Sequence, residues 1–229
     1  MRPTVLLFDI DGTLVTTGGA GRRALERAFE RFYGRPDACA HFAFDGMTDR
    51  AIARQGLTAI GVEATEPVID DLLARYVAVL EDEVARVEAS RYRVHAGMVE
   101  AVQAGLAAGM AVGLGTGNIR EGARVKLERV GLYRHFAFGG FGDDHESRPE
   151  LIRRGAERGA ERLGVALTDA RVVVIGDTPK DVAAAQAMGA QSLGVATGNW
   201  SVAQLLASGA TWAFPTLAAD GALAALLQG

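Results

Sequence analysis

The sequence predicts an α/β fold, in which a doubly wound parallel sheet forms the core and an all-helical segment follows its first strand. Short apolar runs alternate with stretches of helical periodicity, which is typical of a parallel sheet covered by helices. Residues 18–92 interrupt this alternation, because helical periodicity continues there without a confident strand. A length of 229 residues is enough for a core with a smaller insert.

Four apolar segments are the expected strands of the sheet. The third is the clearest, because four β-branched residues follow one another in Val172-Val173-Val174-Ile175. In chain order the expected strands are residues 4–8, 110–115, 171–176 and 191–196. Helical patterns fill the intervals between the later strands, at residues 98–109, 120–130, 150–163 and 180–188.

The inserted segment shows two helical patterns. An apolar face at helical spacing begins at Ala20 and extends to Phe32. A helix start at Thr65-Glu66-Pro67 opens a second pattern that continues toward Val87. With joints near Gly18-Gly19 and Ala89-Ser90, we expect residues 1–17 and 93–229 to form the core and residues 18–92 a separate helical unit.

Composition limits the cellular setting and the partners. An apolar content of 49% with 23% charged residues is ordinary for a soluble globular protein. The net charge of −4 argues against nucleic acid as a partner. A single cysteine, Cys39, excludes an internal disulfide, and the chain has neither a signal-peptide layout nor an apolar run of membrane-spanning length. We therefore expect a cytoplasmic protein without a membrane partner. The composition indicates no oligomeric state.

Two carboxylates stand where the first strand should end. Asp9 and Asp11 are one residue apart, and in extended chain such a pair points to the same side. Two like charges this close need a cation or a shared proton. Gly12 allows the backbone to turn sharply toward a ligand. Because open α/β sheets bind ligands at the carboxyl ends of their strands, the pair predicts phosphate or metal chemistry.

Three further polar segments follow later strands or begin later helices. Thr116-Gly117-Asn118 offers a hydroxyl and accessible backbone N–H groups that suit a phosphate oxygen. Arg148, expected just before a helix, brings a permanent charge and a forked set of donors. Asp177 ends the clearest strand and is placed as a hard oxygen ligand for Mg²⁺, with Asp181 one helical turn later. No dinucleotide-binding loop is expected. Gly113, Gly115 and Gly117 resemble the glycine pattern of such a loop only loosely, because Asn118 and Ile119 interrupt it.

These four segments, in this order, resemble the four motifs of the haloacid dehalogenase superfamily of aspartate-nucleophile hydrolases, whose core is Rossmann-like. The likeness extends from Asp9 to Asp181, and the helical insert is similar to the cap domain of the phosphoglycolate phosphatase-like branch. One position departs from the family, which commonly has Lys-Pro where this chain has Arg148-Pro149. Lys126 is the alternative source of that positive charge.

The resemblance implies a Mg²⁺-dependent phosphatase that acts through an aspartyl-phosphate. It implies that Asp9 is the nucleophile and Asp11 the general acid and base. The Asp9 carboxylate, the Asp11 backbone carbonyl and Asp177 would hold Mg²⁺. The implied phosphate-binding residues are Thr116, Gly117, Asn118 and Arg148, and Asp181 would support the metal's water shell or the basic residue.

In such a hydrolase the cap selects the leaving group. The segment at residues 44–50 is the expected specificity element, with Thr48 and Arg50 as candidates, because it places polar groups beside a glycine. The expected substrate is a small phosphorylated metabolite, either phosphoglycolate-like or a sugar phosphate. Two alternatives stay open: a sugar phosphomutase on the same scaffold, and a catalytically idle binding protein. Dehalogenation is disfavoured, because those relatives lack the second aspartate that Asp11 supplies here.

Overall fold

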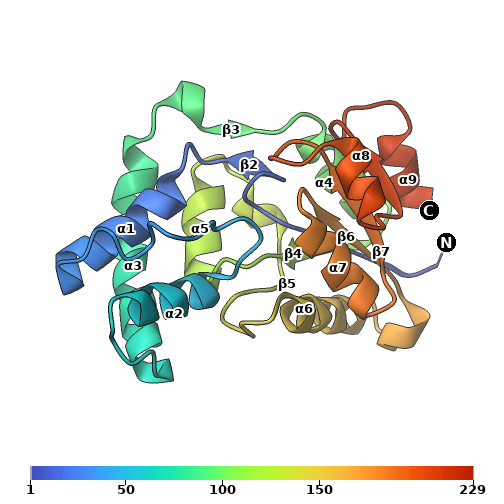
Figure 1. Cartoon of the computed structure of the whole chain (residues 1–229). Coiled ribbons are helices and arrows are strands. Elements are labelled where there is room, and N and C mark those ends of the chain that lie inside the picture. Colours follow the sequence, from blue (N-terminus) through green and yellow to red (C-terminus); the bar gives the residue numbers. More distant parts are fainter. Residues whose placement is uncertain (1, 229) are drawn as a thin grey trace.

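The computed structural model describes residues 2–228, and a six-stranded parallel sheet lies at its centre (Figure 1). The strands are arranged in the order β5-β4-β1-β6-β7-β8, and every neighbouring pair is parallel. Their bounds are Thr4–Phe8 for β1, Ala111–Gly115 for β4, Gly139–Gly140 for β5, Arg171–Gly176 for β6, Gln191–Val195 for β7 and Trp212–Phe214 for β8. Strand β1 therefore lies between β4 and β6.

Helices cover both faces of this sheet. Alternate residues of β1 enter two different hydrophobic clusters: Leu6 and Phe8 pack with α4, α5 and α9, whereas Val5 and Leu7 pack with α6 and α7. The core helices are α4 (Met98–Ala107), α5 (Arg120–Glu128), α6 (Arg148–Arg162), α7 (Pro179–Ala187), α8 (Val202–Ala207) and α9 (Ala222–Gln228), with 3₁₀ turns at Tyr133–His135 and Leu167–Asp169. Burial on both faces explains why the strand sequences are continuously apolar.

Residues 18–92, the expected helical insert, lie beside this sheet at the left of Figure 1. The insert contains α1 (Ala20–Tyr33), α2 (Asp49–Ala59), α3 (Glu66–Arg86) and a 3₁₀ turn at Ala89–Arg91. Two short antiparallel strands, β2 (Val15–Thr16) and β3 (Arg93–Val94), connect it to the core. The hydrophobic cluster of the insert also includes Ile119 and Val125, so the insert packs against α5.

The predicted fold class is confirmed, and the four predicted strands are present with ends that shift by at most one residue. Two further strands of the sheet escaped prediction. Strand β5 consists of two glycines, which carry no strand signal, and β8 has three half-buried residues. Arg148 is the first residue of α6 rather than a residue that precedes the helix, because Pro149 is well suited to the first helical turn. None of the helices within residues 2–228 is long and apolar enough to cross a membrane.

Candidate active site

The predicted site residues meet at the carboxyl ends of three neighbouring strands. Asp9 follows β1, Thr116 follows β4, and Asp177 follows β6. Because the sheet order places β4 and β6 on either side of β1, these three loops are adjacent. They form the floor of a cavity of about 470 Å³ between the core and the helical insert. The fold thus brings segments together that are more than 160 residues apart in the chain, as the 164-residue separation between Thr13 and Asp177 illustrates.

Three buried carboxylates form a cluster on this floor. Ligand oxygens of Asp9, Asp177 and Asp181 all lie within 4.8 Å of one another. Burial, with Asp181 and Asp9 as like-charged neighbours, raises the pKa of Asp177 to about 8. Burial also raises the pKa of Asp9 to about 6, although Arg148 opposes this effect. Without a further cation, the surroundings therefore do not neutralise the cluster in its fully ionised form, and the two carboxyl groups retain protons to higher pH.

The cluster has the donor set that a hard divalent cation requires. The Thr13 hydroxyl donates to Oδ1 of Asp177 at 3.0 Å, which fixes the carboxylate at the lining of the cavity. Gly12 and Gly198 flank that carboxylate so closely that a side chain at either position would overlap it. Oxygen ligands of this kind suit Mg²⁺. Asp9 and Asp177 would hold the ion.

Arg148 is the cation beside Asp9. Its Nη2 atom lies 3.1 Å from Oδ1 of Asp9 and 2.6 Å from Oδ1 of Asp181, and its Nε donates to Asp181 at 2.9 Å. Neither Nη2 contact has the direction of a hydrogen bond, so this buried nitrogen has ion-pair neighbours but no hydrogen-bond partner within the described residues. Asp181 fixes Arg148 on one side and, on the other, accepts hydrogen bonds from the backbone N–H and hydroxyl of Thr178 at the start of α7. Asp181 thus positions the cation.

Lys126 lies beside Asp11 instead. Its Nζ donates to Oδ2 of Asp11 at 2.7 Å and to Oδ1 of Asn118 at 2.5 Å. Burial opposes ionisation of Asp11, but the Lys126 ammonium outweighs it and, with hydrogen bonds from Asn118 and Thr17, lowers the pKa of Asp11. The two cations considered in the sequence are therefore both present in the cavity. Each lies beside a different aspartate.

The loop after β4 holds Asp11 and Lys126 in place through hydrogen bonds of Asn118. Thr116 is fully buried, and its hydroxyl accepts hydrogen bonds from the backbone and side-chain N–H groups of Asn118. Asn118 in turn donates to Oδ2 of Asp11 at 2.9 Å. Gly117 and Asn118 line the cavity, whereas Thr116 lies beneath it. The side chain of Asn118 is thus occupied by Asp11 and Lys126, and Gly117, which is itself buried, completes the part of the loop that lines the cavity.

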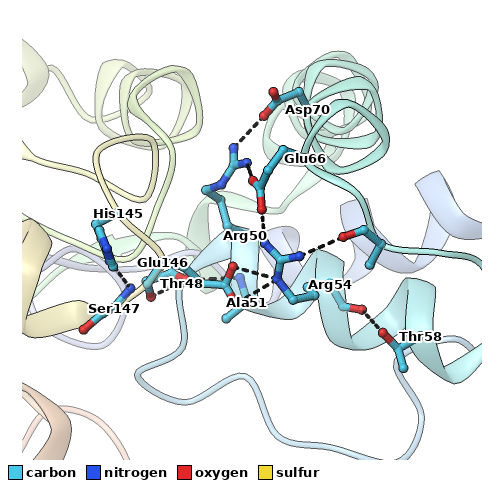
Figure 2. Close-up of polar contacts among 11 residues, drawn as sticks. Thr48, Arg50, Ala51, Arg54, Thr58, Glu66, Asp70, His145, Glu146 and Ser147 are labelled. Atoms are coloured by element: carbon cyan, nitrogen blue, oxygen red, sulfur yellow. Dashed lines mark hydrogen bonds and ion pairs between the residues drawn. The ribbon is translucent and has the colours of Figure 1, made fainter.

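The two residues expected to set specificity, Thr48 and Arg50, are not among the residues that line the cavity, and Figure 2 shows their contacts with other groups. Thr48 is the N-cap of α2: its hydroxyl accepts from the Ala51 N–H and donates to the Glu146 carbonyl. The Arg50 side chain pairs with Glu66 and, at 2.6 Å, with Asp70 on α3. The start of α2 at Asp49 explains both positions, because it turns residue 48 into a cap and residue 50 toward the neighbouring helix. Their neighbours Met47 and Asp49 line the cavity instead.

The segment before α2 is tightly docked on the core. The Asp49 N–H donates to the Gly117 carbonyl at 2.8 Å, and Oδ2 of Asp49 accepts from the Ile119 N–H at 2.9 Å. An ion pair of 2.9 Å between Arg54 and Glu146 reinforces the contact (Figure 2). The Met47 carbonyl occupies the place where a Cβ at Gly117 would lie. The absence of a side chain at Gly117 thus permits this docking.

A methyl group at Gly117 should disturb the docking. We expect Gly117→Ala to lower the free energy of unfolding by about 1–3 kcal/mol, because backbone atoms of Met47 and Thr48 have to move. The matched control is Gly122→Ala in α5, where a Cβ would make only contacts of 3.4 Å or longer and alanine favours the helix. Urea unfolding of both variants measures the difference. Equal stability of the two variants would show that the close approach is not required.

Several residues of the site were not singled out from the sequence. Thr13 anchors Asp177, Thr17 donates to Asp11 at 3.5 Å, and Tyr76 lines the cavity from α3. Thr13 had a detectable signal, because it belongs to the first motif. Tyr76 had none, because it occupies one apolar position among many on an amphipathic helix.

Similar proteins are known from their structures. CbbY from Rhodobacter sphaeroides, solved in complex with phosphate, has a TM-score of 0.70 at 17% identity, with 98% of this chain and 100% of that chain covered. A predicted phosphoglycolate phosphatase from Haemophilus somnus 129PT has a TM-score of 0.67 at 16% identity, with 95% and 96% covered. A predicted phosphatase from Clostridium acetobutylicum has a TM-score of 0.67 at 18% identity, with both chains fully (100%) covered. At such identities the likeness shows the fold alone.

Sequence comparison adds the family. No curated protein sequence matches this chain. The family model for haloacid dehalogenase-like hydrolases, in contrast, matches residues 6–195, which include the carboxylate cluster, both cations and the helical insert. This chain therefore belongs to the haloacid dehalogenase-like hydrolase family.

Proposed function

We propose that this protein is a Mg²⁺-dependent phosphatase that hydrolyses a small phosphorylated metabolite through an aspartyl-phosphate on Asp9. One observation carries the proposal: the two aspartates of the first motif have different surroundings. Asp9 is buried beside Arg148 and the carboxylate cluster, whereas Asp11 is bound by Lys126 and has a side chain that is 43% exposed. Such a division suits a nucleophile and a proton carrier.

In the first half-reaction, a carboxylate oxygen of Asp9 attacks phosphorus, and the bond from phosphorus to the alcohol oxygen breaks. Asp11 gives a proton to the leaving alcohol. Its lowered pKa favours the anion in the free enzyme, and an approaching phosphate dianion raises that pKa again. In the second half-reaction Asp11 takes a proton from the water that attacks the aspartyl-phosphate, which releases phosphate and restores the Asp9 carboxylate.

The remaining groups bind and orient the phosphoryl group. The Arg148 guanidinium lies 3.1 Å from Asp9 and lines the cavity, and Gly117 lines the same floor. Charge on the phosphoryl oxygens is stabilised by such fixed donors. Mg²⁺ bound by Asp9 and Asp177 would offset the negative charge of nucleophile and substrate together. We also propose that residues 18–92 act as a cap that excludes water from the cavity.

The proposal is tested by measuring inorganic phosphate release from a panel of phosphate monoesters, with Mg²⁺ and with a chelator. We expect release that depends on Mg²⁺ for at least one small phosphorylated metabolite. Interconversion of sugar phosphate isomers without net phosphate release would instead identify a mutase. Neither release nor interconversion with any ester would contradict catalysis and favour a binding role.

A further inference from the structure

A tyrosine hydroxyl without a partner lies inside the cavity. Tyr76 projects from α3, is only 2% exposed, and lines the cavity. Within residues 2–228 no group forms a hydrogen bond with its hydroxyl, and Asp49 and Asp11 are the charged groups that act on it. Buried tyrosine hydroxyls usually have a partner. The geometry therefore leaves this donor and acceptor for a molecule that enters the cavity.

Two charged groups lie near this hydroxyl. The Tyr76 hydroxyl and the Lys126 ammonium both lie beside Gly21, at the start of α1. A Cβ on Gly21 would be 3.7 Å from the hydroxyl and 3.1 Å from Nζ of Lys126. Asp49 lines the same cavity; its Oδ2 accepts from the Ile119 N–H, and its Oδ1 has no hydrogen-bond partner among the described residues. The hydroxyl of Tyr76 and the free oxygen of Asp49 are thus two hydrogen-bonding groups supplied by the insert.

The charge of this region disfavours an anionic ligand. The Lys126 ammonium is already paired with Asp11 at 2.7 Å, and Asp49 adds a second carboxylate nearby. Arg22 is the other cation at this end of the cavity, but it pairs with Glu26 at 3.1 Å and donates to the Phe42 carbonyl at 3.2 Å. A leaving group that carries a carboxylate would meet Asp11 and Asp49 without an unpaired cation to receive it.

The walls between these polar groups are apolar. Leu25, Ile52 and Met47 line the cavity there and offer only van der Waals contact. A small alcohol with further hydroxyl groups matches this pattern, because its hydroxyls bond to Tyr76 and Asp49 while its carbon skeleton packs on the walls.

We propose that Tyr76 and Asp49 form a leaving-group subsite that selects phosphate esters of neutral polyhydroxy alcohols, such as polyol or sugar phosphates, over phosphorylated carboxylic acids. The inference rests on the proposed phosphatase activity. Tyr76 and Asp49 determine specificity and take no part in the transfer of the phosphoryl group.

The test compares kcat/KM for three esters: glycerol phosphate, phosphoglycolate and ethyl phosphate. Ethyl phosphate has neither a carboxylate nor a further hydroxyl. Its kcat/KM therefore depends on the catalytic residues and not on contacts with Tyr76 and Asp49. We expect the wild-type enzyme to prefer glycerol phosphate over phosphoglycolate at least tenfold. Tyr76→Phe should lower kcat/KM for glycerol phosphate about tenfold, because a hydroxyl of the substrate loses its partner, and should lower that for ethyl phosphate less than threefold.

Two further variants complete the design. Tyr33→Phe, in α1 and outside the cavity lining, is the matched control and should leave all three values as they are. Asp49→Asn keeps an acceptor for the Ile119 N–H but removes the charge, so it should raise kcat/KM for phosphoglycolate severalfold.

The outcomes separate the inference from the proposed function. A wild-type preference for phosphoglycolate, or an equal loss with all three esters in Tyr76→Phe, would overturn the subsite while the phosphatase activity stands. No hydrolysis of any ester, ethyl phosphate included, would overturn the phosphatase proposal and the subsite with it.

Discussion

Asp9→Asn is expected to abolish Mg²⁺-dependent phosphate release and to leave the fold intact. Asparagine has the shape of aspartate but is a far weaker nucleophile, so turnover should fall on the order of 10³-fold or more. The fold should tolerate the change, because burial and the neighbouring carboxylates already disfavour a charge at this position, as the pKa of about 6 indicates. Phosphate release and a thermal unfolding curve of the same preparation provide the measurement.

Asp220→Asn is the matched control for this experiment. Asp220 is exposed and lies outside the cavity lining, so the same chemical change there should alter neither turnover nor stability. Undiminished turnover of Asp9→Asn would refute the assignment of the nucleophile. A variant that is inactive because it is unfolded would be recognised by the loss of its thermal transition.

The floor of the site could be predicted from the sequence because its residues stand in local patterns. Each of the strands β1, β4 and β6 is a buried apolar run, and each leads directly into a polar segment. Strand parallelism then brings Asp9, Thr116 and Asp177 together without any knowledge of the tertiary contacts. The sequence did not predict that Arg148 pairs with Asp9 and Lys126 with Asp11. Both cations project from helices, and the sequence does not determine how each helix is rotated about its own axis.

The side of the cavity formed by the insert was less predictable for a related reason. Its residues project from α1, α2 and α3, and their direction depends on where each helix begins. The start of α2 at Asp49 turns Arg50 toward Glu66 and Asp70 (Figure 2) and places Asp49 in the cavity. The lining of the cavity on this side thus depends on helix packing, which short motifs do not encode.

Mg²⁺ should stabilise the protein more at alkaline than at acidic pH. The folded protein raises the pKa of Asp9 to about 6 and that of Asp177 to about 8, above the value of 3.8 for an aspartate in an unfolded chain. In the absence of metal, the folded state therefore binds protons more tightly than the unfolded state, and the protein loses stability as the pH rises from about 4 to about 8. Mg²⁺ binds the ionised carboxylates and replaces these protons, so its stabilising effect should grow across the same interval.

Melting temperatures measured between pH 5.5 and pH 8.5, with Mg²⁺ and with a chelator, check this expectation. The difference between the two curves should widen with pH and should shrink in Asp177→Asn, which removes the carboxylate with the larger shift. Asp169→Asn, at an exposed carboxylate outside the cavity, should leave the difference as in the wild type. A pH-independent difference would mean that the ion does not bind at the carboxylate cluster. A widening difference that persists in Asp177→Asn would assign the metal to other carboxylates.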